Sequence, residues 1–523
     1  MTPRSEPLSI GTERLRADYD ATPYTSDAFP QSAPGRLAAI AHVFGLRTPH
    51  VATARVLEIG CAAGGNVIPF AAFHPDAEVI GIDLSPVQID RARSTATALA
   101  LDNLEFIAAD IAELDLSTLG RFDYVVAHGV YSWVPQEVLE ALLASIRAVM
   151  SPDGVSYVSY NTYPGWKSKE VVRDAMLLAS GASRTPVQKA ADAREFVDVL
   201  RDVAPADGVL ARVLAEFQAR DMDFGDAFLL HDELEAFNAP CYFYEMLGHA
   251  RRHGLEFVAE ARPEAMFATN HGEKVAEYVN RKAGGVQILV EQYLDFVTNR
   301  AFRESLFTHA ENASRIRYDL TPDRLRSLHL AAWSPPVGGA TVLDHSRQEF
   351  EVGDGATLFT NDPGLKAALE ALNDRWPWTL SRSELVTEVS RRLTDAGLTA
   401  GDRLGDHVDN LIGVLVVQGH AQYRLDALRP EPTVDAGLRL DEPIRRLAGL
   451  ARPGSEDSLF NLWHETLLLS PMDRRAFPLL DGTRDRHALV RALRGDDGSD
   501  DNARSSADYV DALPDLLRQL KLG

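Results

Sequence analysis

The chain has little positive charge, few cysteines and no long apolar run, and each shortage excludes a class of protein. Its 523 residues carry 53 Lys and Arg against 76 Asp and Glu, which gives a formal net charge of -23. Because phosphate contacts depend on basic side chains, this balance excludes a general nucleic-acid binder and suits a basic or lysine-bearing partner. Two cysteines, Cys61 and Cys241, cannot form a disulfide framework, which indicates a reducing compartment.

No segment has the composition of a secretion signal or of a membrane span. The polar start, Met1–Pro7, leads into no apolar region. No window approaches the run of about 18 apolar residues that a spanning helix needs. We therefore expect a cytoplasmic protein without a membrane anchor. The length exceeds what one hydrophobic core usually supports, so we expect roughly two to four domains.

A glycine-rich turn between two apolar runs is the most informative feature that is present. Val56–Ile59 is apolar apart from Glu58, as in a strand buried on both faces. The turn Gly60–Asn66 follows, then a short helical run, and then the apolar run Glu78–Ile82, which ends at Asp83. This order of strand, tight turn, helix, strand and acid predicts a right-handed parallel β-α-β unit.

Two acids in this unit indicate which ligand it holds. The turn has Ala62 where the dinucleotide pattern G-x-G-x-x-G has its middle glycine, and Glu58 lies two residues before Gly60. A carboxylate beside the ligand would repel a pyrophosphate but would favour an ammonium or sulfonium cation. Asp83 follows Gly64 by 19 positions, about the spacing at which an acid meets a ribose diol. The pattern therefore favours S-adenosylmethionine over NAD.

A third acid is expected at the same edge of the sheet. Residues 104–109 read as a third strand, and Asp110 stands at its C-terminal end. Ligands of open α/β sheets bind outside these ends, so Asp83 and Asp110 are placed to hold the ribose hydroxyls and the adenine amino group. The other expected elements are a helix at 36–46, a helix capped by Ser85, a fourth strand at 121–127, a helix from Gln136, a turn at 151–154 and a fifth strand at 155–161.

This order of elements resembles the class I S-adenosylmethionine-dependent methyltransferases. The resemblance covers roughly residues 40–170 and rests on Glu58–Gly60, Asp83, Asp110 and the Pro-Asp-Gly turn before the fifth strand. It implies an α/β fold with a Rossmann-like, mostly parallel seven-stranded sheet and helices on both faces.

A narrower resemblance extends over more of the chain. Several motifs are similar to those of methyltransferases that carry a methyltransferase regulatory domain: Tyr19–Tyr24, Gly60–Asn66, Tyr160–Trp166, His231–Leu234, Phe243–Glu245, His253–Leu255, Ala259–Ala261, Glu291–Phe296 and Asn299–Arg303. That group includes bacterial protein-lysine methyltransferases acting on surface proteins. The resemblance implies S-adenosylmethionine as cofactor and a lysine-bearing protein as substrate.

The candidate site residues come from the turn, the strand ends and the aromatic N-terminal arm. The cofactor candidates are Tyr24, Glu58, Gly60, Cys61, Gly64, Asn66, Asp83, Leu84, Asp110, Ile111, His128 and Gly129. The catalytic candidates follow the fourth and fifth strands and are His128, Tyr131, Trp133, Asn161 and Tyr163. An aromatic, partly desolvated channel would lower the pKa of a lysine amine, and the ring faces can hold its cation by cation–π contact. We expect Asn161 to orient the amine through its carbonyl, and His128 to line the cofactor or act as base.

Composition and turn signals divide the chain into five parts. We expect a methyltransferase domain with an N-terminal arm at 1–175, a mainly helical regulatory or substrate domain at 176–330, a linker at 331–355, a winged-helix-like domain at 356–430 and a helical C-terminal region at 431–523. The candidate recognition helix of the winged-helix-like domain has two acids and no lysine or arginine. This excludes DNA reading and favours a role in protein interaction or packing.

One histidine pair has the spacing of metal ligands. His249 and His253 stand at i and i+4 of a predicted helix, which places both rings on one face. The sequence pattern lacks the glutamate of H-E-x-x-H and suggests no third ligand. A surface helix without a metal is therefore the expectation.

Three functions stay open on sequence alone. The first is a protein-lysine N-methyltransferase whose helical and C-terminal domains bind the protein substrate. The second is a small-molecule O- or N-methyltransferase, in which the extra domains form a lid or a homodimer. The third is a non-catalytic S-adenosylmethionine sensor that acts through the winged-helix-like module.

Overall fold

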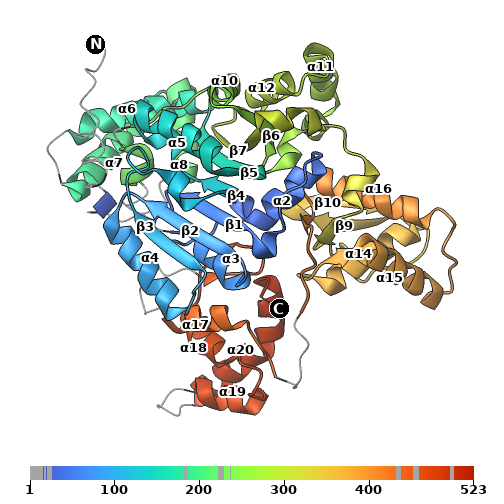
Figure 1. The fold of residues 1–523 in the computed structure, drawn as a ribbon. Helices are drawn as coiled ribbons and strands as arrows, with labels where there is room; N and C mark the ends of the chain where they lie inside the picture. Colours follow the sequence, from blue (N-terminus) through green and yellow to red (C-terminus); the bar gives the residue numbers. More distant parts are fainter. Residues whose placement is uncertain are drawn as a thin grey trace.

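A seven-stranded sheet in the order β3-β2-β1-β4-β5-β7-β6 forms the centre of the protein (Figure 1). The computed structural model describes residues 16, 19–20, 26–181, 185–221, 229–235, 237–430, 437–450, 459–494 and 500–522. The parallel strands are β1 (Arg55–Ile59), β2 (Glu78–Asp83), β3 (Leu104–Ala108), β4 (Phe122–Ala127) and β5 (Met150–Asn161). The two antiparallel strands are β7 (Phe302–His309), which pairs with β5, and β6 (Leu255–Glu260), which pairs with β7. The Rossmann-like, mostly parallel sheet is confirmed.

The predicted β-α-β unit is present, because its local signals act as expected. Strands β1 and β2 are joined by α3 (Val67–Phe73) and pair in parallel register. The next helix, α4 (Pro86–Ala98), begins where the Ser85 hydroxyl accepts the Gln88 N–H at 3.2 Å. Other helices pack on the sheet, namely α2 (Pro34–Val43), α5 (Gln136–Val149) and α10 (Phe243–Arg252).

Two strands of the sheet come from the segment that the sequence assigned to a helical domain. Both β6 and β7 lie beyond residue 175, so the boundary expected there does not separate the sheet from the regulatory region. Short apolar runs such as Leu255–Glu260 acquire strand structure from pairing with β7 and β5, which local patterning does not reveal. The remainder is mainly helical, as expected: α6 (Trp166–Ser180), α7 (Pro186–Val203), α8 (Val209–Asp221), α11 (Glu273–Ala283), α12 (Gln287–Thr298) and α13 (Pro322–Leu325).

The turn predicted at 151–154 is wrong. These residues belong to β5, where the register against β4 passes from Phe122–Met150 to Tyr124–Val155. The extra residues are taken up as a bulge, so the Pro-Asp-Gly signal bends the strand without ending it.

Residues beyond 330 form two further groups of elements (Figure 1). The predicted helices of the winged-helix-like segment are α14 (Pro363–Arg375), α15 (Arg382–Asp395) and α16 (Leu404–Val417), beside the three-stranded sheet β11 (Leu380–Ser381), β8 (His329–Ala331) and β12 (Gln422–Arg424). The expected linker is partly wrong, since β9 (Gln348–Val352) pairs with β10 (Ala356–Thr360). The last group contains α17 (Glu442–Leu450), β13 (Leu459–Phe460), β14 (Thr466–Leu467), α18 (Pro471–Ala476), α19 (Arg486–Leu493) and α20 (Asp500–Gln519).

Among the described helices, none has both the length and the apolarity that crossing a bilayer demands.

Candidate active site

A pocket of about 410 Å³ opens at the carboxyl ends of β1, β2, β3 and β4. Many of the predicted site residues line it together: Glu58, Gly60, Cys61, Asn66, Asp83, Leu84, Asp110, Ile111, His128, Gly129, Trp133 and Asn161. Residues that are far apart in the sequence converge here, because parallel strands present their carboxyl ends at one edge.

Three predicted residues lie outside the pocket lining, each for a visible reason. Gly64 has a φ of +80°, and a Cβ there would lie 2.7 Å from the Phe106 ring, so this glycine serves packing. The buried Tyr131 hydroxyl lies 2.9 Å from Nδ1 of His249. The Tyr163 hydroxyl donates to Glu170 at 2.6 Å. Tyr24, the remaining candidate, lies outside the described residues.

Glu58 provides a buried acceptor for a cation. Its Oε1 accepts a hydrogen bond from Nδ2 of Asn66 at 2.8 Å, whereas its buried Oε2 has no hydrogen-bond partner among the described residues. Burial raises the pKa of the Glu58 carboxyl to about 8, and the nearby Asp83 charge adds to the rise while Asn66 opposes it. A positively charged group beside Oε2 would satisfy this atom and stabilise the ionised carboxylate.

Asp83 holds the backbone of the turn and keeps acceptor capacity for a ligand. Its Oδ2 accepts the Ala62 N–H at 2.8 Å, and its Oδ1 accepts the Ser85 N–H at 2.9 Å. Ala62 has a φ of +46°, so the alanine at the middle glycine position adopts the left-handed conformation that glycine favours. Each carboxylate oxygen has a second lone pair, which allows hydrogen bonds to a ribose diol.

The N-terminal arm covers one side of the pocket. The Phe29 ring stacks on the His128 ring with centroids 3.9 Å apart, and the Phe29 N–H donates to Oδ1 of Asn66 at 3.0 Å. The His128 Nδ1 lies 2.9 Å from the Tyr157 hydroxyl, and burial lowers the pKa of this imidazole to about 4. His128 is therefore neutral at pH 7 and a weak base.

The C-terminal hairpin reaches the same place from the other end of the chain. Nε2 of His464 lies 2.8 Å from Oδ1 of Asn66, the residue that also bonds Glu58. The Thr466 hydroxyl accepts the Ala28 N–H at 2.8 Å. The hairpin β13–β14 thus fixes both the arm and the residue that positions Glu58.

Beyond the strand ends the pocket wall becomes aromatic and carries charged groups. The Trp133 and Trp166 rings meet edge to face with centroids 6.1 Å apart. Nδ2 of Asn161 donates to Oδ1 of Asn238 at 3.0 Å, which leaves the Asn161 carbonyl as an acceptor. Sequence reasoning did not single out four lining residues at this end and beside the arm: Phe29, Lys169, Glu233 and Phe302. All except Lys169 lie in or beside segments with recognisable motifs, but no local signal shows that they meet.

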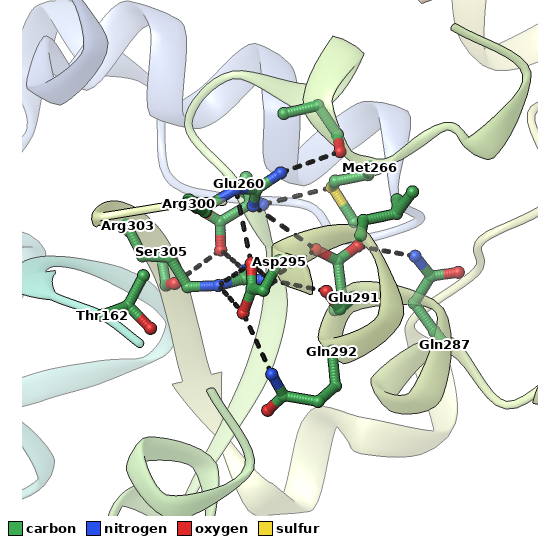
Figure 2. Close-up of polar contacts among 12 residues, drawn as sticks. Thr162, Glu260, Met266, Gln287, Glu291, Gln292, Asp295, Arg300, Arg303 and Ser305 are labelled. Carbon is green, nitrogen blue, oxygen red and sulfur yellow. Dashed lines mark hydrogen bonds and ion pairs between the residues drawn. The ribbon is translucent and has the colours of Figure 1, made fainter. Parts of the chain in front are cut away.

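A buried charge cluster surrounds Arg303, the residue after the pocket-lining Phe302, and Figure 2 shows the contacts within this cluster. The guanidinium of Arg303, on β7, donates to Glu260 at 2.5 Å, to Asp295 at 2.8 Å and to Glu291 at 3.2 Å. At the start of β7, Phe302 pairs with Asn161 of β5, and the Ala301 carbonyl accepts the Thr162 N–H at 2.9 Å. The cluster therefore fixes the segment from which the regulatory region contributes to the pocket.

Family models match three parts of the chain. Residues 56–154 match a methyltransferase domain, residues 225–309 match "Predicted methyltransferase regulatory domain", and residues 446–500 match "PKMT, C-terminal winged helix domain". The last match lies C-terminal to the segment 356–430, for which the sequence predicted a winged-helix-like domain. A winged helix is thus present in the C-terminal region.

Known proteins are similar over nearly the whole length. An uncharacterized protein of Rickettsia prowazekii is 31% identical over 494 residues, which are 93% of this chain and 87% of that protein. The structure of PKMT2 from Rickettsia typhi in complex with AdoHcy matches with a TM-score of 0.83 at 25% identity, over 96% of this chain and 100% of that one. Trans-aconitate 2-methyltransferase of Methylobacterium nodulans is 28% identical over 180 residues, which are 33% of this chain and 64% of that enzyme.

The matched segments, the full-length relative and the converging strand ends agree on one assignment. The chain belongs to the class I S-adenosylmethionine-dependent methyltransferases that carry a methyltransferase regulatory domain, and S-adenosylmethionine is its methyl donor.

Proposed function

We propose that this methyltransferase transfers methyl groups to lysine side chains of a protein substrate. The observation that carries the proposal is the acceptor end of the pocket, which is lined by Trp133, Trp166, Asn161 and the buried acid Glu233. This wall already holds one cation of the chain, because Nζ of Lys169 lies 4.8 Å from the centroid of the Trp166 ring and 3.9 Å from Oε1 of Glu233. Aromatic faces and a carboxylate together suit a cationic amine on an aliphatic chain. The full-length likeness to PKMT2 of Rickettsia typhi, which bears the abbreviation of protein-lysine methyltransferase, supports the same acceptor class.

The residues of the pocket have distinct roles in this reaction. S-adenosylmethionine supplies a methyl group on a positively charged sulfur. Glu58 holds positive charge through its free Oε2, and Asp83 with Asp110 orients the nucleoside, so that the methyl group points to the aromatic end. When bound by Glu58, Asp83 and Asp110, the cofactor would supply an electrophilic methyl group to an acceptor nitrogen at the aromatic end, and its sulfur would take up the electron pair.

A lysine must first lose a proton, because its ammonium has no lone pair and an ordinary pKa near 10.4. Desolvation by the aromatic wall lowers the pKa of the amine against the opposing effect of the Glu233 charge, and the proton then leaves to solvent. Asn161 then accepts a hydrogen bond from the neutral amine and fixes its orientation. We assign His128 to lining the pocket, since a base with a pKa of about 4 accepts such a proton poorly.

Labelled cofactor distinguishes the acceptor classes. The full chain is incubated with methyl-labelled S-adenosylmethionine and a panel of bacterial proteins, and acid hydrolysates are analysed for methyl-lysine. We expect label in methyl-lysine, with a decrease of about 10-fold or more for Glu233→Gln, since a charge-assisted hydrogen bond contributes roughly 1.5–3 kcal/mol. Cofactor binding by this variant is the internal control. Label that enters only the metabolite fraction would overturn the proposal in favour of a small-molecule acceptor.

The ionisation of Glu58 should make cofactor binding depend on pH. A cation at Oε2 favours the carboxylate, so binding releases a proton below the Glu58 pKa of about 8. The affinity for S-adenosylmethionine should therefore rise with pH from about 6 to 8, by up to about tenfold per pH unit, and level off above. Calorimetry across this range measures the slope. Glu58→Gln, which cannot titrate, should bind more weakly and lose this component, and a slope equal to that of the wild type would contradict the role of Glu58.

A further inference from the structure

Two helices bring three metal-ligand side chains together away from the pocket. His249 and His253, one turn apart at the end of α10, both direct Nε2 toward Glu140 on α5. Oε2 of Glu140 lies 3.0 Å from Nε2 of His249 and 2.7 Å from Nε2 of His253. All three ligand atoms lie within 4.8 Å of one another, and among the described residues this is the one group of its kind.

The structure thus corrects the expectation of a surface histidine pair. His249 is 4% exposed, and the third ligand that the sequence pattern did not show comes from residue 140, on a different helix. No spacing rule links Glu140 to a helix more than 100 positions later, so only the fold reveals the group.

Hydrogen bonds alone leave this group incomplete. His253 is within hydrogen-bond distance of the Glu140 carboxylate, but the buried Nε2 of His249 makes no hydrogen bond of acceptable geometry with any described residue. Two imidazole nitrogens thus converge on one carboxylate oxygen, which is the way in which side chains gather around a metal ion. A cation between the three atoms would satisfy all of them.

The second ring nitrogen of His249 has a hydrogen-bond partner, as in most metal-binding histidines. Its Nδ1 lies 2.9 Å from the hydroxyl of Tyr131, which fixes the orientation of the ring. Tyr131 begins the short 3-10 helix Tyr131–Trp133, whose last residue lines the pocket. The group therefore connects the regulatory region to the loop that carries Trp133.

We infer that Glu140, His249 and His253 bind one divalent transition-metal ion of the zinc class, with water as the fourth ligand. Two imidazoles and one carboxylate select such ions over Mg²⁺ or Ca²⁺, which prefer oxygen ligands. The Glu140 side chain is 43% exposed and that of His253 is 20% exposed, which provides an entry path and room for water. Bonds of about 2.0–2.1 Å in tetrahedral geometry separate ligand atoms by roughly 3.3 Å. The two contacts of Oε2 of Glu140, at 3.0 and 2.7 Å, therefore need to lengthen by about 0.3 and 0.6 Å, and the three ligand atoms, which lie within 4.8 Å of one another, need to settle at this common spacing.

This ion has a structural role, since it lies outside the pocket. It ties α5 of the sheet domain to α10 of the regulatory region and holds His249 against Tyr131. The inference does not depend on which acceptor is methylated.

Metal content of the tag-free full chain tests the inference. The protein is stripped with a chelator and dialysed against ZnCl₂, and bound zinc is measured by mass spectrometry. Wild type should hold about one zinc per chain, and Co²⁺ in its place should give the visible absorption of a tetrahedral site. His253→Gln and Glu140→Gln should each bind at least about 10-fold more weakly, because loss of a ligand costs no less than loss of an outer-shell partner.

The controls separate this site from adventitious binding and from misfolding. His345→Ala removes an exposed histidine elsewhere and should leave the zinc content unchanged. Zinc should raise the Tm of wild type and of His345→Ala but not of the two ligand variants, since an ion that binds only the folded state stabilises it. Absence of zinc from the wild type, or equal zinc in the wild type and His253→Gln, would overturn the inference.

Discussion

Replacement of Arg303 by methionine should lower the free energy of unfolding by about 3–5 kcal/mol, the loss usual when one partner of a buried ion pair is removed. Arg303 is 1% exposed and contacts three acids that are themselves buried, Glu260, Glu291 and Asp295. Methionine has a similar length but no charge. The substitution leaves the guanidinium of Arg300 as the cation that pairs with these carboxyl groups among the described residues, at 3.4 Å from Asp295 and 3.9 Å from Glu291.

Denaturant unfolding monitored by circular dichroism measures this loss, with Arg201→Met as the control. Arg201 pairs with Asp198 at 2.9 Å, and the two side chains are 43% and 47% exposed. Exposed pairs contribute about 0–1 kcal/mol, so the control should unfold almost as the wild type does. Equal and small losses in the two variants would show that the cluster does not stabilise the domain.

The same cluster shows why the site depends on residues distant in sequence. Arg303 is the second residue of β7 and directly follows Phe302, which lies opposite Asn161 and lines the pocket. Loss of the cluster should therefore loosen the acceptor end of the pocket more than the ends of β1 and β2. These two strands pair with each other and do not depend on the cluster. Methyl transfer by Arg303→Met should fall more than cofactor binding does.

The cofactor half of the site was predictable because its signals are local. The apolar run before Gly60, the acid that ends the next strand and the Ser85 cap each depend on a few neighbouring residues. Parallel pairing then brings Gly60, Asp83 and Asp110 to one edge with no further information. Gly64 is the one cofactor candidate among the described residues that misses the pocket lining, and sterics explain its place, since a Cβ there would meet the Phe106 ring.

The acceptor half was less predictable because loops after strands can direct a side chain either way. Trp133 enters the pocket, whereas Tyr131, two residues earlier, turns to His249. The contact between His464 and Asn66 spans 398 positions, and no periodicity in either segment indicates it. The strands β6 and β7 were missed for the same reason, since long-range pairing determines them.

Replacement of Asp83 by alanine should weaken S-adenosylmethionine binding by about 1–3 kcal/mol, or about 5- to 150-fold in Kd. The loss would have two sources. The hydrogen bonds that we propose between Asp83 and the ribose diol would disappear, and the N–H groups of Ala62 and Ser85 would lose their common acceptor. Because Ala62 is held at a φ of +46°, release of its N–H lets the turn relax away from the nucleoside.

In calorimetry, one further variant of Asp83 separates these two sources of the loss, and a variant of Asp90 serves as the control. Asp83→Asn keeps one carbonyl acceptor for the turn but lacks the second, so its affinity should fall between wild type and Asp83→Ala. Asp90→Ala removes an acid whose side chain is 75% exposed on α4, and it should bind as the wild type does, because a screened surface charge contributes little. If Asp83→Ala binds with unchanged affinity, Asp110 alone must orient the nucleoside. That is a demanding role for a carboxylate whose Oδ1 already accepts the Ala112 N–H at 2.8 Å, and the nucleoside would then have to lie in the pocket with its ribose away from β2.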